Sequence, residues 1–232
     1  MRGLLYKEFY QFKSDMYLVF AFLLLLIFPC VGSTGDPELI SMVLSLCYMI
    51  ALLLGGMLSS EFFSKDEKRS WSNFVFSLPQ TEKGQVTAKY YAVLLFHLLV
   101  LFVCFVIDTI VVAIYGSVTV SGIMAAVIVF AWRILVCAIK IPFMLRFGSM
   151  MGNVVEAACF GMILMLLGVY ALFGDISFFL QDNIRDALVA FVTSGNVIWI
   201  LALLPYVAGV AYYLSYRVSL KAYREGAESY GQ

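Results

Sequence analysis

Charged side chains are scarce in this sequence, and their scarcity limits the class of protein. Only 13% of the 232 residues are Asp, Glu, Lys or Arg, whereas 63% are hydrophobic. A soluble domain carries about 25% charged and about 45–50% apolar residues. So little charge cannot cover a surface that faces water. The sequence therefore predicts an integral membrane protein.

The residues of common catalytic and metal sites are also few. The sequence has a single histidine, His97, and lacks the GxxxxGK[ST] phosphate-binding loop and the HExxH and GxSxG motifs. Its five cysteines form no CxxC pair. We therefore expect no catalytic residue, no metal site, no cofactor on this chain and no enzyme activity. The lack of a long basic or acidic tail argues against a nucleic-acid partner.

Hydrophobic runs long enough to cross a bilayer occur six times. A spanning helix needs about 20 mostly apolar residues, because each adds about 1.5 Å across a core of about 30 Å. The six predicted spans comprise residues 16–32, 39–58, 91–114, 122–139, 154–173 and 197–216. The sequence thus predicts one all-α transmembrane domain over residues 1–232.

Positive charge lies on one side of these spans. Every Lys and Arg except Arg133 and Arg185 falls in the two terminal segments or in the segments after spans two and four. The segments after spans one and five instead hold five carboxylates and one Arg. Because basic residues mark the cytoplasmic side, we expect both termini and the segments after spans two and four to be cytoplasmic.

Residues 1–15 predict an amphipathic helix that precedes the first span. Leu5, Phe9, Phe12 and Met16 recur at spacings of four, three and four, which places them on one helical face. Such a helix lies in the inner membrane interface. A second interpretation remains open, in which the segment is only a positively charged stop for span one.

Residues 64–90 are longer than a simple connection requires. Ser64 and Glu67 have the spacing of a capping box, and Pro79 ends the helix that would begin there. A second short helix can begin at Thr81 and run into span three. The first helix would carry one apolar stripe of Trp71, Phe74, Val75 and Leu78. Two interpretations remain open: the stripe docks into a groove of a soluble partner, or it rests on lipid headgroups.

Residues 174–194 predict a further interfacial helix on the outer side, either a gate or a passive cover.

Charge deep inside a span is costly, and three ionisable side chains are noted there. Asp108 lies toward the outer side of span three, whereas His97 and Arg133 lie nearer the inner side of spans three and four. Either Arg133 pairs with Asp108 or extends to the interface, or these residues line a path.

Small residues at positions 51, 55 and 59 and at 161 and 168 predict close internal helix packing, with a dimer seam as the alternative.

Four segments carry a resemblance to a known family. They read MRGLLYKEFYQFK, DEKRSWSNFVFSLPQTEKGQVTAKYY, IPFMLRFGSMMGN for a short inner turn, and SYRVSLKAYRE at the close. Together they resemble the small membrane permeases of bacterial type 2 ABC exporters over the whole chain. The pattern DEK, W, SLP, V, KY in the second segment is the most specific part.

This resemblance implies a multi-pass protein of the bacterial plasma membrane that works as a dimer, with itself or with a related permease. A separate ABC ATPase subunit would bind ATP and Mg²⁺. Residues 66–78 would form the coupling helix on that subunit, residues 2–15 the connecting helix, and residues 174–194 the external helices. The ATPase-coupling residues would be Asp66, Glu67, Lys68, Arg69, Trp71, Phe74, Val75, Leu78 and Pro79.

The expected function is export of amphipathic or hydrophobic substrates. By length and overall character the chain is similar to permeases for amphipathic peptides, such as phenol-soluble modulin toxins and peptide antibiotics. The alternative is a proton-coupled secondary transporter with a relay through Asp108, His97 and Arg133. It would need no ATPase.

Overall fold

Long apolar runs with few helix-breaking residues form long helices in the computed structural model. It describes residues 3–10, 13, 17, 21, 37–58, 63, 82–115, 121–173 and 195–229, and every one of these except Gly148 is helical. The principal helices are α2 (Pro37–Leu58), α5 (Glu82–Tyr115), α6 (Ser121–Phe147), α7 (Ser149–Phe173) and α9 (Gly195–Ser229). The prediction of an all-α fold is confirmed for these residues.

Helices occupy five of the six predicted spans. Three stretches are long and apolar enough to cross a membrane, namely Lys83–Ala113, Ala125–Phe147 and Ser149–Leu166, and Val43–Gly56 in α2 is a shorter apolar stretch. Nearly all of the first predicted span, residues 16–32, lies outside the described residues. The count of six spans and the orientation stay predictions.

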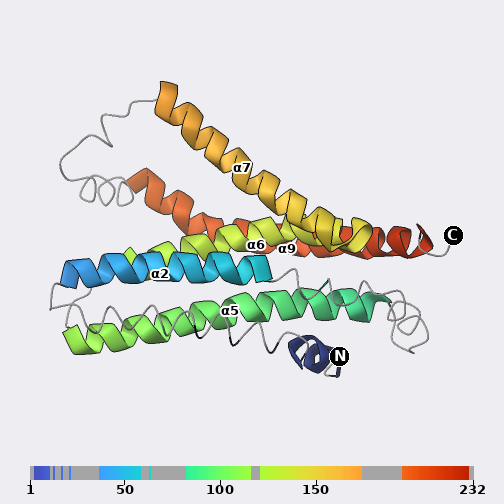
Figure 1. Ribbon diagram of the computed structural model, residues 1–232, viewed down its shortest axis with the longest axis horizontal. Coiled ribbons are helices and arrows are strands. Elements are labelled where there is room, and N and C mark those ends of the chain that lie inside the picture. Colours follow the sequence, from blue (N-terminus) through green and yellow to red (C-terminus); the bar gives the residue numbers. More distant parts are fainter. Residues whose placement is uncertain are drawn as a thin grey trace.

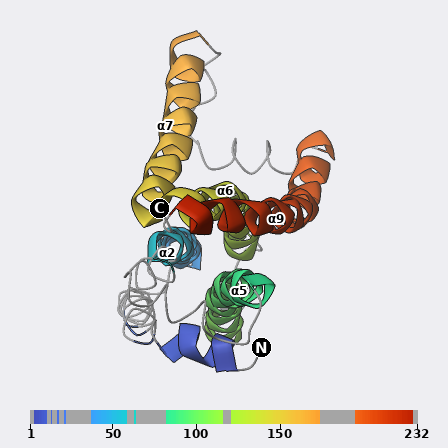
Figure 2. The same ribbon diagram turned by 90° about the vertical axis from the view of Figure 1, so that its right-hand side faces the viewer.

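Helix α6 is the centre of the bundle. It packs against α2, α5, α7 and α9, and α5 also contacts α2 and α9. Figure 1 shows α2, α5 and α6 running side by side along the long axis, while α7 leaves the bundle at an angle. Figure 2 shows the end of α7 well away from α2 and α5. Residues 3–10 and the end of α9 lie at the same end of the bundle (Figure 1).

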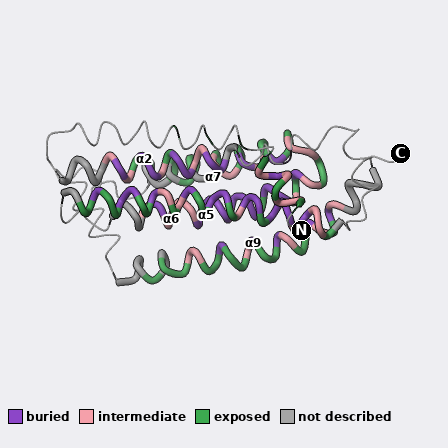
Figure 3. Tube along the Cα trace, turned by 90° about the horizontal axis from the view of Figure 1, so that it is seen from below, coloured by how far each residue is buried: buried purple, intermediate pink, exposed green. Residues whose placement is uncertain are grey.

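Buried positions are frequent along α2, α5 and α6, whereas most of the coloured part of α9 is exposed or intermediate (Figure 3). The core includes Tyr48 and Leu52 from α2, Phe96 from α5 and Ile141 from α6. Large apolar side chains also cover the outside of the bundle, because lipid rather than water surrounds a membrane helix. Examples are Phe102, Phe105, Ile110, Met162, Leu164 and Leu203.

The predicted inner turn at residues 141–153 is wrong in its extent. Helix α6 continues to Phe147 with Pro142 inside it, and α7 begins at Ser149. The connection is the single residue Gly148, whose φ of 89° suits a residue without a β carbon. Its amide donates to the Met144 carbonyl at 3.0 Å, which caps α6. Lys140 is therefore a buried helical residue and not a loop residue.

The expected close packing at small residues is confirmed on α2 and wrong on α7. Ala51 is fully buried, and a β carbon at Gly55 would meet the Phe96 ring at 3.3 Å. Position 59 lies outside the described residues. Gly161 and Gly168 have nothing within 4 Å of such a carbon. Gly161 and Gly168 therefore serve no internal contact of the described helices.

Candidate functional site

A buried charge cluster, formed by Arg133, Lys140 and Glu156, joins α6 to α7. Arg133 and Lys140 are seven positions apart on α6, about two turns, and so share a face. Nη2 of Arg133 donates to Oε1 of Glu156 at 2.7 Å, and Nζ of Lys140 donates to Oε2 of the same carboxylate. All three side chains are buried. One carboxylate on α7 thus bridges two cations on α6.

The surroundings of Arg133 fix its position. A β carbon at Gly56 of α2 would overlap the guanidinium, so only glycine leaves room for it. The guanidinium carbon lies 5.7 Å from the ring centroid of Phe160, one turn after Glu156 on α7. Nε and Nη1 of Arg133 are buried without a hydrogen-bond partner. Arg133 therefore has donor capacity that Glu156 does not use.

His97 of α5 lies within electrostatic range of Arg133, Lys140 and Glu156. Its Nδ1 lies 2.8 Å from the carbonyl of Val93, one turn earlier. A carbonyl only accepts, so Nδ1 carries the proton, and Nε2 of the neutral ring is an acceptor. That Nε2 is buried and has no hydrogen-bond partner.

Of the open alternatives for the polar residues inside the spans, the pairing of Arg133 with Asp108 is wrong. Arg133 bonds to Glu156, and within the part of the chain that the structure describes Asp108 makes no ion pair. Asp108 is buried on α5, eleven residues after His97, about three turns. The structure thus places His97 within electrostatic range of Arg133, and it shows no pairing of Asp108 with either residue within the described part of the chain.

Sequence reasoning missed Glu156 and Lys140. The sequence analysis places Lys140 in the cytoplasmic segment after span four, and it gives Glu156 no role although this residue lies inside the fifth predicted span. A signal was present, because Arg133 and Lys140 have the spacing of one helical face and Glu156 is the one acid in α7.

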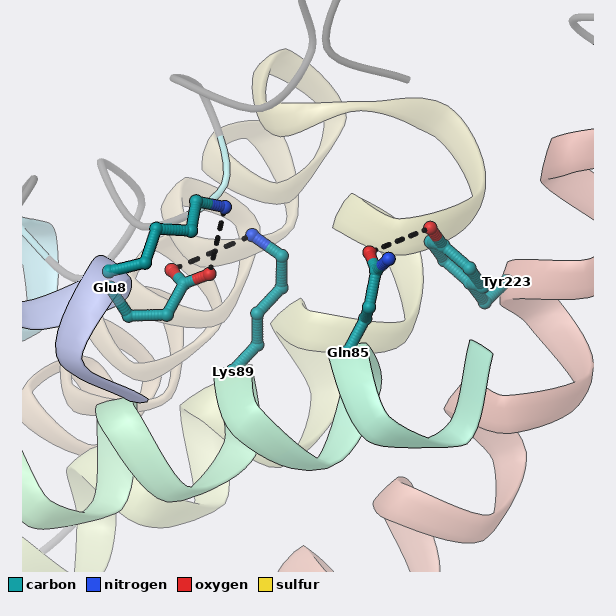
Figure 4. Close-up of polar contacts among 5 residues, drawn as sticks. Glu8, Gln85, Lys89 and Tyr223 are labelled. Atoms are coloured by element: carbon teal, nitrogen blue, oxygen red, sulfur yellow. Dashed lines mark hydrogen bonds and ion pairs between the residues drawn. The ribbon is translucent and has the colours of Figure 1, made fainter. Parts of the chain in front are cut away.

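A second group of polar contacts fastens residues 3–10 to the start of α5 (Figure 4). Glu8 is buried and lies 3.2 Å from Nζ of Lys7 and 3.9 Å from Nζ of Lys89. The Lys89 ammonium also lies 4.8 Å from the ring centroid of Phe63. We call Glu8, Lys89 and Phe63 the inner brace. Phe63 lies in the sequence between α2 and α5, and Lys89 lies near the start of α5.

The helix expected at the N-terminus is present over residues 3–10, but its faces differ from the prediction. Leu5 and Phe9 are half-buried, whereas Glu8 points inward and is almost fully buried. Tyr6 and Tyr10 are exposed. Phe12 and Met16 lie outside the described residues.

Hydroxyl groups join α5 to α9 along a polar seam. Ser215 donates to the Ala138 carbonyl at 2.5 Å, so toward Tyr90 it accepts. The Tyr90 hydroxyl lies 2.6 Å from Ser215 and 2.6 Å from Ser219, and therefore donates to Ser215 and accepts from Ser219. The other bonds of the seam join Thr87 to Tyr216 at 2.9 Å, Tyr223 to Gln85 at 3.4 Å and Tyr212 to the Tyr90 carbonyl at 2.8 Å. Figure 4 shows the contact between Gln85 of α5 and Tyr223 of α9.

The ATPase-coupling residues, Asp66 to Pro79, lie outside the described residues, as do residues 174–194. The structure describes the flanks of the coupling segment only. Phe63 is buried before it, and α5 begins at Glu82 after it. The coupling helix and the external helix stay predictions.

Comparison with known proteins gives one result. A family model described as ABC-2 family transporter protein matches residues 3–224. Neither the curated proteins nor the solved structures gave a significant match. The matched range includes the charge cluster and the inner brace.

Proposed function

Since this chain belongs to the ABC-2 family of transporter proteins, and is therefore a multi-pass integral membrane protein and the permease of an ABC transporter, we propose that it exports amphipathic molecules. The family match over residues 3–224 is the observation that carries this proposal. Its ABC ATPase partner would bind ATP and Mg²⁺ and hydrolyse the nucleotide. Peptides with one apolar and one polar face are the proposed substrates.

The described helices are consistent with such substrates. Leu164, Met165 and Leu166 on α7 are exposed and offer apolar surface, whereas the charge cluster places fixed charge inside the bundle. An amphipathic molecule can contact the apolar surface of α7 with its apolar face and the charge cluster with its polar face. A proton relay gains no support from the described residues, because Arg133 is bonded to Glu156 and Asp108 makes no ion pair among them.

We further propose that residues 66–78 form the coupling helix. The inner brace supports this proposal, because Phe63 and Lys89 flank the segment and contact each other, and Lys89 also pairs with Glu8 of residues 3–10. Buried contacts at the ends of a segment restrict its motion. A displacement of the coupling segment by the ATPase would therefore move α2 and α5 together. The exposed apolar side chains of α7 are compatible with a second copy of the chain, and we propose a homodimer.

The test is co-purification of the permease with its ATPase from membranes. Trp71→Ala combined with Phe74→Ala should release the ATPase or abolish substrate-stimulated ATP hydrolysis. The matched control is Trp199→Ala with Tyr206→Ala, which removes two exposed aromatic rings from α9. An ATPase that stays bound and stimulated in the first variant would contradict the coupling helix.

Transport itself distinguishes the energy sources. Inside-out vesicles that contain both subunits should take up a fluorescent amphipathic peptide only with ATP and Mg²⁺. Uptake should survive a protonophore. Uptake that needs no ATP and stops when the proton gradient collapses would refute the ATP-driven exporter.

A further inference from the structure

The charge cluster carries one more cation than anions. Arg133 and Lys140 contribute two positive charges, and Glu156 contributes one negative charge. All three are buried, and buried charge is costly unless it is compensated. His97, which lies within electrostatic range of the cluster, adds no negative charge, because its Nδ1 donates to the Val93 carbonyl. The cluster is therefore suited to a second anionic group.

The bond between Arg133 and Glu156 uses little of the guanidinium. A guanidinium binds a carboxylate best through two parallel N–H groups. Glu156 receives only Nη2 of Arg133 and gives its other oxygen to Lys140. Nε and Nη1 stay unpaired although Arg133 is fully buried. A free carboxylate could bind this arginine through two nitrogens, which Glu156 does not do here.

Glu156 comes from the helix with the least packing around it. Among the described helices, α7 packs mainly against α6. Only Gly148 separates the two, and Gly152 lies so close to the Met144 side chain that a β carbon there would overlap it. Beyond Phe160, Leu164, Met165 and Leu166 are exposed although they point in directions about 100° apart. A pivot of α7 at Gly148 would withdraw Glu156 and leave both cations on α6.

We propose that Arg133 and Lys140 form a binding site for a carboxylate of the transported molecule, a site that Glu156 occupies in this state. The proposal rests on the proposed permease function. Movement of the start of α7 away from α6 removes Glu156, and the substrate carboxylate takes its place with one oxygen toward each cation. The unpaired Nε and Nη1 of Arg133 supply further bonds to the incoming group. Return of Glu156 then displaces the carboxylate.

The experiment uses the purified full chain in phosphatidylcholine nanodiscs. The probes are two labelled amphipathic helical peptides of one sequence, made of Leu, Ser and Lys and acetylated at the N-terminus, with a C-terminal carboxylate or a C-terminal amide. The carboxylate peptide should bind the wild type several-fold more tightly than the amide. Glu156→Gln removes the carboxylate that competes with the peptide for Arg133 and Lys140. This variant should increase the ratio of the two peptide affinities about tenfold, which corresponds to the free energy of about one charged hydrogen bond.

Lys140→Met keeps the proposal testable if Glu156→Gln does not fold. This variant retains the neutral Arg133–Glu156 pair and should bring the two peptide affinities close together. Lys221→Met is the matched control, because Lys221 is exposed on α9, and its ratio should equal that of the wild type. A lipid phosphate is the other source of an anion. If phosphatidylglycerol nanodiscs abolish the preference, the site binds lipid and the assignment to substrate is overturned.

Two further results would overturn the proposal. One is equal affinity for both peptides in the wild type and in Glu156→Gln. The other is a preference for carboxylate that persists unchanged in Lys140→Met. In both cases, ATP-dependent uptake of the amide peptide would leave the proposed exporter function intact. Failure of that uptake in the wild type would instead count against peptide export.

Discussion

The guanidinium of Arg133 lies directly against the backbone of Gly56, so that α2 and α6 approach each other at a charged side chain. A β carbon at position 56 would overlap Nη2, Nε and Cζ of Arg133. The same guanidinium bonds to Glu156 at 2.7 Å and faces the ring of Phe160. In this state a single arginine thus contacts three helices, and the absence of a methyl group at position 56 leaves room for it.

Gly56→Ala should destabilise the protein. An alanine favours a helix by about 1 kcal/mol relative to glycine, but the added methyl group would displace Arg133 and weaken its bond to Glu156. We expect a net loss of about 2 kcal/mol or more in the free energy of unfolding. Denaturant unfolding in detergent measures it. Gly209→Ala is the control, because nothing lies within 4 Å of a β carbon there; a similar loss in both variants would contradict the role of Gly56.

Removing Glu156 and removing Lys140 should have unequal effects. Glu156→Gln leaves two buried cations without their carboxylate, and breaking a buried pair in this way costs about 3–5 kcal/mol. Lys140→Met leaves the neutral pair of Arg133 and Glu156, so its cost should stay within about 1 kcal/mol. Thermal unfolding of both variants at equal lipid content checks the order. An equal loss would mean that the excess positive charge has no energetic consequence.

The spans could be predicted because each depends on its own residues. A bilayer requires about 20 apolar residues in succession, and this requirement located α2, α5, α6, α7 and α9 without knowledge of their neighbours. The end of α6 could not be placed in this way. Lys140 and Arg146 suggested a loop after residue 139, yet the helix continues to Phe147 because Glu156 compensates Lys140 inside the bundle.

The candidate site could be predicted only in part, because it depends on which helices meet. His97 and Arg133 were recognised as polar residues inside spans. The carboxylate that pairs with Arg133 was not recognised, because the sequence does not distinguish Glu156 from Asp108 until the position of α7 against α6 is known. The N-terminal helix shows the same limit. Its apolar spacing was recognised, but the inward position of Glu8 depends on Lys89, which is far away in sequence.

Tyr90→Phe should weaken the seam between α5 and α9. The Tyr90 hydroxyl donates to Ser215 and accepts from Ser219, so the phenylalanine leaves Ser219 without this acceptor. The expected loss is about 1–2 kcal/mol, the upper part of the range for hydrogen bonds between membrane helices. Tyr91→Phe is a close control, since Tyr91 is the next residue and is exposed. Unfolding measurements that show equal losses would exclude a special role for the buried hydroxyl.

Glu8→Gln should loosen residues 3–10 from the start of α5. The change removes the negative charge that lies 3.9 Å from the Lys89 ammonium in a buried position. Hydrogen exchange of the backbone amides in residues 3–10 should accelerate about fivefold to tenfold, which corresponds to about 1 kcal/mol of opening free energy. Lys221→Gln, an exposed cation on α9, should leave this exchange unchanged.

The charge reversal of the same pair tests whether the contact is electrostatic. Glu8→Lys alone places a cation beside both Lys7 and Lys89 and should accelerate exchange further. Combining it with Lys89→Glu restores an opposite pair, so the double variant should recover much of the protection if the two positions interact directly. Additive losses in the double variant would show that residues 3–10 are held by Leu5 and Phe9 instead. Phe63 also contacts Lys89. If the inner brace stiffens the coupling segment, the variants with the fastest exchange should show the weakest stimulation of ATP hydrolysis by substrate.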